Sequence, residues 1–172
     1  MLVAYKGVLP RLHQGAFVEN SAQVVGDVEL GPDASVWFNA VVRGDIHHVR
    51  LGEATNIQDC CVLHVIGGTH PCIVEDHVTV GHGAIIHGAV VRSRCLIGMG
   101  AVVLDGADVG EGSVIAAGAV VAPNMKVPRG SLVMGVPAKV VRQVTAGEAE
   151  RIEEGWRNYV ALKADYTQGQ TP

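Results

Sequence analysis

The chain has 172 residues, a formal net charge of −4 at pH 7 and 48% hydrophobic residues. We therefore expect residues 1–172 to form one globular domain. The weak charge, without a basic run, argues against nucleic-acid binding, and no stretch is long and apolar enough to span a membrane. The N-terminus has no secretory pattern and the four cysteines fit a reducing compartment, so a cytoplasmic location is expected.

Aliphatic residues recur every six positions through most of the chain. The count needs insertions at 48–50 and 69–73 and one step of five before Val91, and is then unbroken to Val133. The positions are Val24, Leu30, Val36, Val42, Leu51, Ile57, Leu63, Val74, Val80, Ile86, Val91, Ile97, Val103, Val109, Ile115, Val121, Val127 and Val133. The residue four positions further on is usually small.

A sustained period of six is typical of a parallel β-helix, because α-helices recur at 3.6 residues and ordinary strands at two. Three hexads close one triangular coil of about 18 residues, with a strand on each face and a turn at each corner. The aliphatic residues point to the axis, and the 22 glycines suit corners with left-handed backbone angles. The predicted fold class is an all-β parallel β-helix of six coils over about residues 10–140.

The rhythm stops after Val133, and a helix is predicted beyond it. The segment Thr145-Ala-Gly-Glu148 is typical of a capping box at a helix N-terminus. Apolar residues then recur at helical spacing, at Ala149, Ile152, Trp156, Tyr159 and Val160. We predict an α-helix over about 146–164, with its apolar face against the β-helix or a neighbouring chain, and a frayed tail over 168–172.

Three histidines occupy defined places in the six-residue rhythm. His64 and His87 each follow an inward residue on one face, here called face A, so they should point outward one coil apart and share an ion. His82 belongs to the preceding face, across a corner, and should point elsewhere. We therefore predict a metal site shared between subunits of a cyclic trimer, with His82 supplied by the neighbour. Three imidazoles and one open position are typical of catalytic zinc, although Fe²⁺ or Co²⁺ would also suit imidazole ligands.

Polar residues lie close to these histidines in the same register. Arg43 takes the histidine place on face A one coil lower, and Asp45 follows two residues later. The segment 56–59 contributes Asn56, Gln58 and Asp59. Asp59 occupies the same position in its hexad as His82, one coil lower. A carboxylate and an amide here could orient a metal-activated water and a substrate by hydrogen bonding. The plainer interpretation is a polar rim with an ion pair between Arg43 and Asp45 across the subunit interface.

Five short motifs together resemble the γ-class carbonic anhydrase family of left-handed β-helix, hexapeptide-repeat proteins. They are Arg43-Gly44-Asp45, Asn56-Ile57-Gln58-Asp59, Val62-Leu63-His64, Val80-Gly81-His82 and Ile86-His87-Gly88. The resemblance covers about residues 10–145. It implies left-handed coils and a homotrimer with Zn²⁺ at each subunit interface, bound by His64 and His87 of one chain and His82 of the next.

The resemblance also implies roles for the surrounding residues. The arginine and aspartate of Arg43-Gly44-Asp45 would form an intersubunit salt bridge. Gln58 would contact the metal-bound water or bicarbonate, and Asn56 and Asp59 would support the site. Tyr159 would overhang the pocket from the C-terminal helix.

The chain departs from the best-established members of that family in two places. Segment 65–72 is short and has no carboxylate, whereas those members carry a long acidic loop with a glutamate that shuttles protons; Ile46 also replaces an acidic residue. The expected reaction is the attack of zinc-bound hydroxide on CO2 to give bicarbonate, slowed by the missing shuttle.

Two alternatives on the same trimeric scaffold stay open: a zinc-dependent thioesterase or related hydrolase, and a non-catalytic binding protein. Hexapeptide acyltransferases use a catalytic histidine without a metal, and the stacked histidine pair argues against that class.

Overall fold

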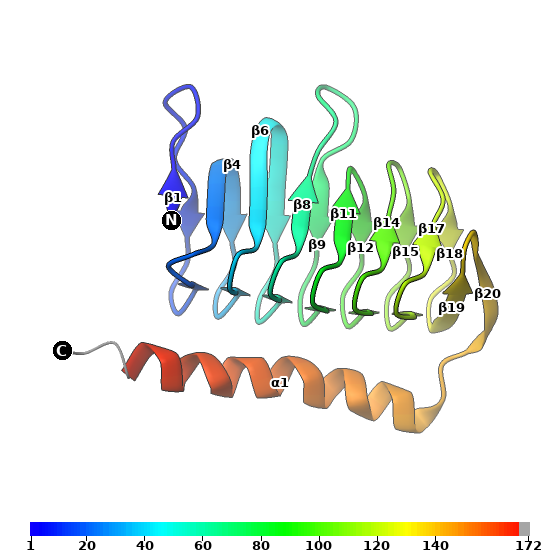
Figure 1. Ribbon diagram of the computed structural model, residues 1–172. Coiled ribbons are helices and arrows are strands. Elements are labelled where there is room, and N and C mark those ends of the chain that lie inside the picture. The colour runs from blue at the N-terminus through cyan, green and yellow to red at the C-terminus, as the bar shows by residue number, and fades with distance from the viewer. Residues whose placement is uncertain (169–172) are drawn as a thin grey trace.

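The computed structural model describes residues 1–168 as a stack of triangular coils with a long helix beneath it (Figure 1). This confirms the predicted all-β parallel β-helix with a C-terminal α-helix. A frayed tail was expected over 168–172. Gln168 ends α1, and residues 169–172 lie outside the described residues. Within the described residues, α1 (Ala146–Gln168) lacks the apolar length that a membrane span requires.

Two parallel sheets form the three faces of the stack. The 12-stranded sheet consists of β1 (Leu2–Val3), β2 (Arg11–Leu12), β4 (Gln23–Leu30), β6 (Val41–Leu51), β8 (Val62–His64), β9 (Cys72–Val74), β11 (Ile85–His87), β12 (Val90–Val91), β14 (Val102–Val103), β15 (Asp108–Val109), β17 (Val120–Val121) and β18 (Lys126–Val127). The 8-stranded sheet consists of β3 (Phe17–Val18), β5 (Ser35–Val36), β7 (Asn56–Ile57), β10 (Thr79–Val80), β13 (Leu96–Ile97), β16 (Val114–Ile115), β19 (Ser131–Gly135) and an antiparallel last strand, β20 (Ala138–Gln143).

Strands β4 and β6 pass around a corner without interruption and thereby join two faces into one sheet. Face A holds their first halves with β8, β11, β14 and β17. Face B holds their second halves with β2, β9, β12, β15 and β18. The 8-stranded sheet is face C.

Strand pairing reproduces the six-residue count, including its gaps. Leu63 pairs with Val42 on one side and with Ile86 on the other, and Ile57 pairs with Val80 on face C. Every inward position of the count is at most 4% exposed. Burying each such side chain stabilises the fold by about 1.5–3 kcal/mol, so the core specifies the register of successive coils.

One further coil precedes the six that the rhythm predicts. β1 and β2 pair with β4, and β3 pairs with β5. The period was not visible there because the segment between β1 and β2 bulges outward as a loop, as the blue segment of Figure 1 shows.

Some glycines serve a purpose other than left-handed turns. A Cβ atom on Gly98 would lie 2.5 Å from the backbone nitrogen of Ala117 in the next coil, although Gly98 does not have a positive φ. Gly81 likewise faces the backbone nitrogen of Met99 at 2.9 Å. These glycines are required because successive coils approach closely, whereas a corner glycine such as Gly83 does have a positive φ of 69°.

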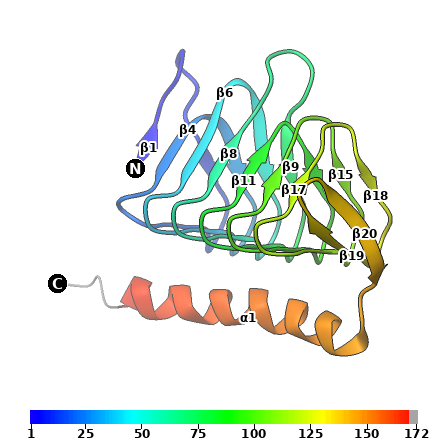
Figure 2. The same cartoon turned by 45° about the vertical axis from the view of Figure 1, so that its right-hand side comes forward.

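Helix α1 runs back along face C and ends beside the first coils (Figures 1 and 2). Its predicted capping box is confirmed: the Glu148 carboxylate accepts hydrogen bonds from the backbone and hydroxyl of Thr145, at 2.8 and 3.0 Å. The helix continues four residues beyond the predicted end at 164. Near that end Lys163, only 8% exposed, pairs with Asp33, and this contact anchors the last turns to the β-helix.

Candidate metal centre

His64 and His87 end β8 and β11, which are neighbouring parallel strands of face A, and the two residues are register partners. Because both follow an inward residue, both side chains point outward, one coil apart. Their rings approach closely, with His64 Nδ1 at 3.1 Å from His87 Nε2. The geometry predicted from the hexad register is therefore present, and the role of the two residues as metal ligands stays a prediction.

The spacing of the two nitrogens fits a shared ion. Two imidazole nitrogens bound at about 2.0 Å to a tetrahedral zinc ion lie roughly 3.3 Å apart. The observed 3.1 Å agrees with that separation. Imidazole nitrogens suit zinc, iron and cobalt alike, so the donor set does not select among the three metals.

Each ring of this pair is held by a carboxylate at its outer nitrogen. Asp45 Oδ1 lies 3.0 Å from His64 Nε2, and Asp105 Oδ1 lies 2.5 Å from His87 Nδ1. Burial alone would raise the pKa of Asp45, but the hydrogen bonds from His64 and Arg43 outweigh it and lower that pKa. Asp45 is therefore a carboxylate at neutral pH.

His82 lies two residues after β10, at the corner between face C and face A, and its side chain is 49% exposed. Its Nδ1 atom is 2.9 Å from Asp59 Oδ2, one coil lower, as the hexad register predicts. Across residues 1–168, no three side chains of the types His, Cys, Asp and Glu gather as a metal-binding group. One chain thus presents two separate parts: the histidine pair on face A and His82 at the corner.

Asn56 and Gln58 lie beneath α1, next to Asp59 in the chain. Gln58 donates a hydrogen bond to Asn56 Oδ1 at 3.1 Å, and Asn56 donates to Thr79 Oγ1 at 3.0 Å. Asn56 is fully buried and Gln58 is 6% exposed. This chain of bonds fixes the Gln58 amide on the His82 side of the candidate site.

Tyr159 of α1 also belongs to the His82 side. Its ring packs edge-on against Trp37, with 5.2 Å between the ring centroids. Burial raises the pKa of Tyr159, and the nearby negative charge of Asp59 raises it further. Tyr159 therefore stays a neutral phenol at neutral pH. Packing against Trp37 fixes its place on the helix.

Arg43 and Asp45 pair with each other within one chain. Both interpretations of these residues expected the ion pair across a subunit interface. The structure contains it within one chain, and a bond across the interface stays a prediction. Because Asp45 also bonds to His64, it links this arginine to the histidine pair.

Two features of the site were missed from the sequence. Asp105, from the coil above His87, was not singled out. A row of outward aliphatic residues on face A, here called the stripe, was also missed; it consists of Val41, Val62, Ile85, Val102 and Val120. The sequence did hold a signal for the stripe, because each member directly precedes an inward residue, whereas the equivalent places on face B include Glu29, Arg50, Asp108 and Lys126.

The fold and its outward residues define a hexapeptide-repeat protein. The family model described as bacterial transferase hexapeptide (six repeats) matches residues 88–123. The chain is 53% identical over 145 residues to a probable carbonic anhydrase of Methanocaldococcus jannaschii, covering 84% of this chain and 91% of that one. It is 44% identical over 160 residues to a carbonic anhydrase of Geobacillus kaustophilus, covering 93% and 87%.

A solved structure described as a putative acetyltransferase of Bacillus cereus superposes with a TM-score of 0.95 at 40% identity, covering 98% of both chains. The chain belongs to the γ-class carbonic anhydrase family of hexapeptide-repeat proteins, and its fold is the left-handed parallel β-helix. The resemblance found in the sequence motifs is thereby confirmed.

Proposed function

We propose that the protein is a metal-dependent carbonic anhydrase that acts as a homotrimer, with a divalent ion, normally Zn²⁺, at each subunit interface. The observation that carries this proposal is the His64–His87 pair, whose nitrogens converge at 3.1 Å while the third histidine lies on a different corner of the chain. Similarity to proteins named carbonic anhydrase at 53% and 44% identity supports the choice of reaction.

The stripe supports the trimer. Val62 and Ile85 are each 38% exposed, and the aliphatic row beside the histidine pair continues above and below them. A contiguous row of exposed apolar side chains marks an interaction surface. In a cyclic trimer, face A of one chain meets a different surface of the next, so the His82 corner of the neighbour completes the site.

Different residues of the chain would bind the metal ion and contact the substrate. His64, His87 and the His82 of the next chain would hold the ion, which supplies a nucleophile at neutral pH when bound. Gln58 donates to Asn56, so its Oε1 atom can accept a hydrogen bond from a substrate or a water. Tyr159, which packs against Trp37 on the His82 side, would overhang the site from α1.

The absence of a carboxylate in segment 65–72 predicts slow proton export. A zinc-dependent thioesterase or related hydrolase would use the same site on an acyl carbonyl. A non-catalytic binding protein would keep the metal without turnover. The similar Bacillus cereus protein is described as a putative acetyltransferase. An acyltransferase of the kind set aside in the sequence analysis would act through a histidine without a metal.

The test begins with metal analysis of protein purified anaerobically, followed by stopped-flow CO2 hydration and acyl-CoA hydrolysis assays. We expect about one ion per chain and measurable CO2 hydration. Acyl-CoA hydrolysis without CO2 hydration would favour the hydrolase. Bound metal without either activity would favour the non-catalytic binding protein. Metal-free protein that transfers acyl groups would contradict the proposal.

Mixed trimers test whether the site is shared. His82→Ala chains keep the histidine pair, and His87→Ala chains keep His82, so neither variant alone completes a site. Co-assembled in equal amounts at random, the two variants place an intact pair beside an intact His82 at about a quarter of the interfaces. We expect about a quarter of the wild-type metal and activity to return. No recovery in proven mixed trimers would contradict a site built from two chains. His13→Ala, at a surface ion pair with Glu29, is the matched control and should bind metal normally.

A further inference from the structure

The carboxylates behind the histidine pair decide which ring nitrogens carry hydrogen. A carboxylate only accepts hydrogen bonds, so the imidazole nitrogen that faces it must be the donor. His87 therefore donates through Nδ1 to Asp105, and His64 donates through Nε2 to Asp45. In the neutral tautomers that result, the lone pairs lie on His87 Nε2 and His64 Nδ1.

Those two lone-pair atoms are the ones that face each other at 3.1 Å. Two lone pairs at this distance repel, and the contact becomes favourable when a cation, whether a metal ion or a bridging proton, lies between them. The arrangement thus holds both rings in the state that a metal ion requires. His82 follows the same pattern, because Asp59 faces its Nδ1 atom at 2.9 Å and leaves Nε2 free.

The position of Asp105 is specified by the local backbone. A Cβ atom on Gly88 would lie 2.6 Å from Asp105 Oδ1, so the carboxylate occupies space that any other residue at position 88 would fill. Gly88 also has a φ of +55°, and its carbonyl oxygen accepts a 2.7 Å hydrogen bond from Gly106. The glycine directly after His87 therefore lets the aspartate of the next coil reach the imidazole.

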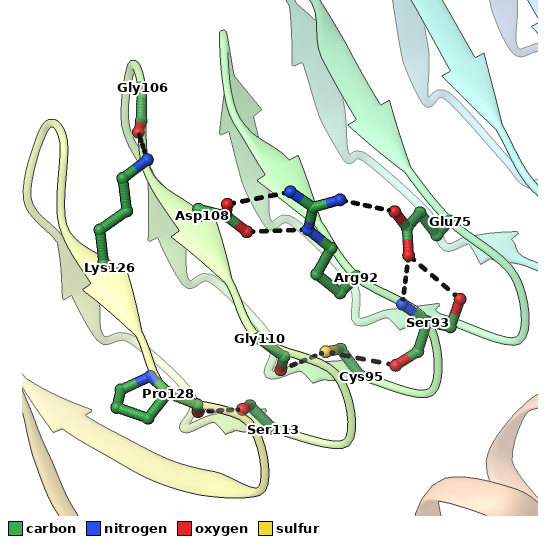
Figure 3. Close-up of polar contacts among 10 residues, drawn as sticks. All are labelled: Glu75, Arg92, Ser93, Cys95, Gly106, Asp108, Gly110, Ser113, Lys126 and Pro128. Carbon is green, nitrogen blue, oxygen red and sulfur yellow. Dashed lines mark hydrogen bonds and ion pairs between the residues drawn. The ribbon is translucent and has the colours of Figure 1, made fainter.

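Asp105 makes one ion pair among the described residues, and its partner is His87. The Asp105 side chain is 31% exposed. By contrast Asp108, three residues later, bonds to Arg92 on face B (Figure 3). Asp105 is thus directed at the histidine pair, whereas Asp108 belongs to a surface ion-pair network.

We propose that Asp105 is a positioning residue of the metal centre, which fixes the tautomer and ring orientation of His87, and that Asp45 does the same for His64. This inference rests on the proposed function for the identity of the site. Carboxylates that hold metal-binding histidines typically contribute 10–100-fold to metal affinity. Asp105 would act through His87 and touch neither the ion nor the substrate.

The first measurement is zinc or cobalt affinity by chelator competition on trimers isolated by size exclusion. We expect Asp105→Ala to weaken binding 10–100-fold and Asp108→Ala to leave it within about twofold. Gly88→Ala should weaken binding as Asp105→Ala does, because its methyl group displaces the same carboxylate. Loss of thermal stability with unchanged affinity would overturn the proposal.

The second measurement needs no metal. Nitrogen-15 NMR of imidazole-labelled, metal-free protein reports the tautomer of each histidine. We expect His87 to carry its proton on Nδ1 in the wild type and to shift toward the Nε2–H form in Asp105→Ala. An unchanged His87 tautomer in Asp105→Ala would overturn the inference even if metal binding is weakened. Failure of the wild type to bind any of the three ions would contradict the proposed function instead, and the tautomer result would still decide this inference.

Discussion

His64 Nδ1 and His87 Nε2 lie 3.1 Å apart although 23 positions separate the two residues in the chain. The strands that carry them are register partners in a parallel sheet, where neighbouring strands are about 4.8 Å apart. The approach of the rings is therefore a direct consequence of coil stacking. Any change that breaks this register should separate the two nitrogens, whereas changes elsewhere on the surface should leave them together.

Ile85→Glu should dissociate the proposed trimer. Ile85 is 38% exposed in the centre of the stripe, and an acidic side chain there would have to lose its hydration in an apolar interface. Val90→Glu is the matched control, because Val90 is an outward residue of β12, the next strand along the chain, which lies on face B. Light scattering after size exclusion should give a monomer for the first variant and a trimer for the second. A trimeric Ile85→Glu protein would place the interface elsewhere.

Ile97→Ala should destabilise the fold by about 2–5 kcal/mol, because the side chain is fully buried on the axis and its removal leaves a cavity. Val136→Ala, at a side chain that is 72% exposed, should change stability by less than about 0.5 kcal/mol. Denaturant midpoints of both variants measure the difference. Equal losses would mean that the axis does not dominate stability.

Gly147→Ala and Gly155→Ala should differ although both lie in α1. A Cβ atom on Gly147 meets nothing within 4 Å, so alanine should stabilise the helix by about 0.5–1 kcal/mol. At Gly155 a Cβ atom would lie 3.3 Å from Thr79 Oγ1, the acceptor of the Asn56 hydrogen bond. Gly155→Ala should therefore gain less stability and reduce activity through Gln58. Thermal melts and the hydration assay on both variants check this, and identical behaviour would contradict the path from α1 to Gln58.

The Arg92–Asp108 pair predicts a pH dependence of stability. The hydrogen bond from Arg92 lowers the pKa of Asp108 below its ordinary value of about 3.9 (Figure 3). A lowered folded-state pKa contributes stability in full above the unfolded pKa, and this stability is lost as pH falls from about 4 toward the folded-state value. Asp108→Asn should lower stability at pH 7 and flatten its decline below pH 4. The free energy of unfolding of both proteins is measured by denaturant titrations across that pH range. If it falls with pH as steeply in Asp108→Asn as in the wild type, the pH dependence does not come from the Arg92–Asp108 pair.

Much of the fold was predictable because the same aliphatic pattern recurs in every coil. Val, Leu or Ile every six residues fixes which side chains face the axis. The insertion before Leu51 is absorbed within β6, which continues around the corner, and the insertion before Val74 falls between β8 and β9. The first coil was missed because a loop between β1 and β2 breaks the period. The extra helical turn beyond residue 164 depends on contacts such as that of Lys163 with Asp33, which the sequence pattern does not reveal.

The sequence by itself determined the core, the parallel stack, the start of the C-terminal helix and the shared outward direction of His64 and His87, because these follow from a local period. Only the tertiary structure decided that Asp105 reaches His87 and that Asn56 and Gln58 are buried beneath α1. Those contacts join coils, or the helix and a face, and their distances depend on how turns and side chains pack in three dimensions. A local repeat specifies direction, whereas contact between distant segments requires the assembled fold.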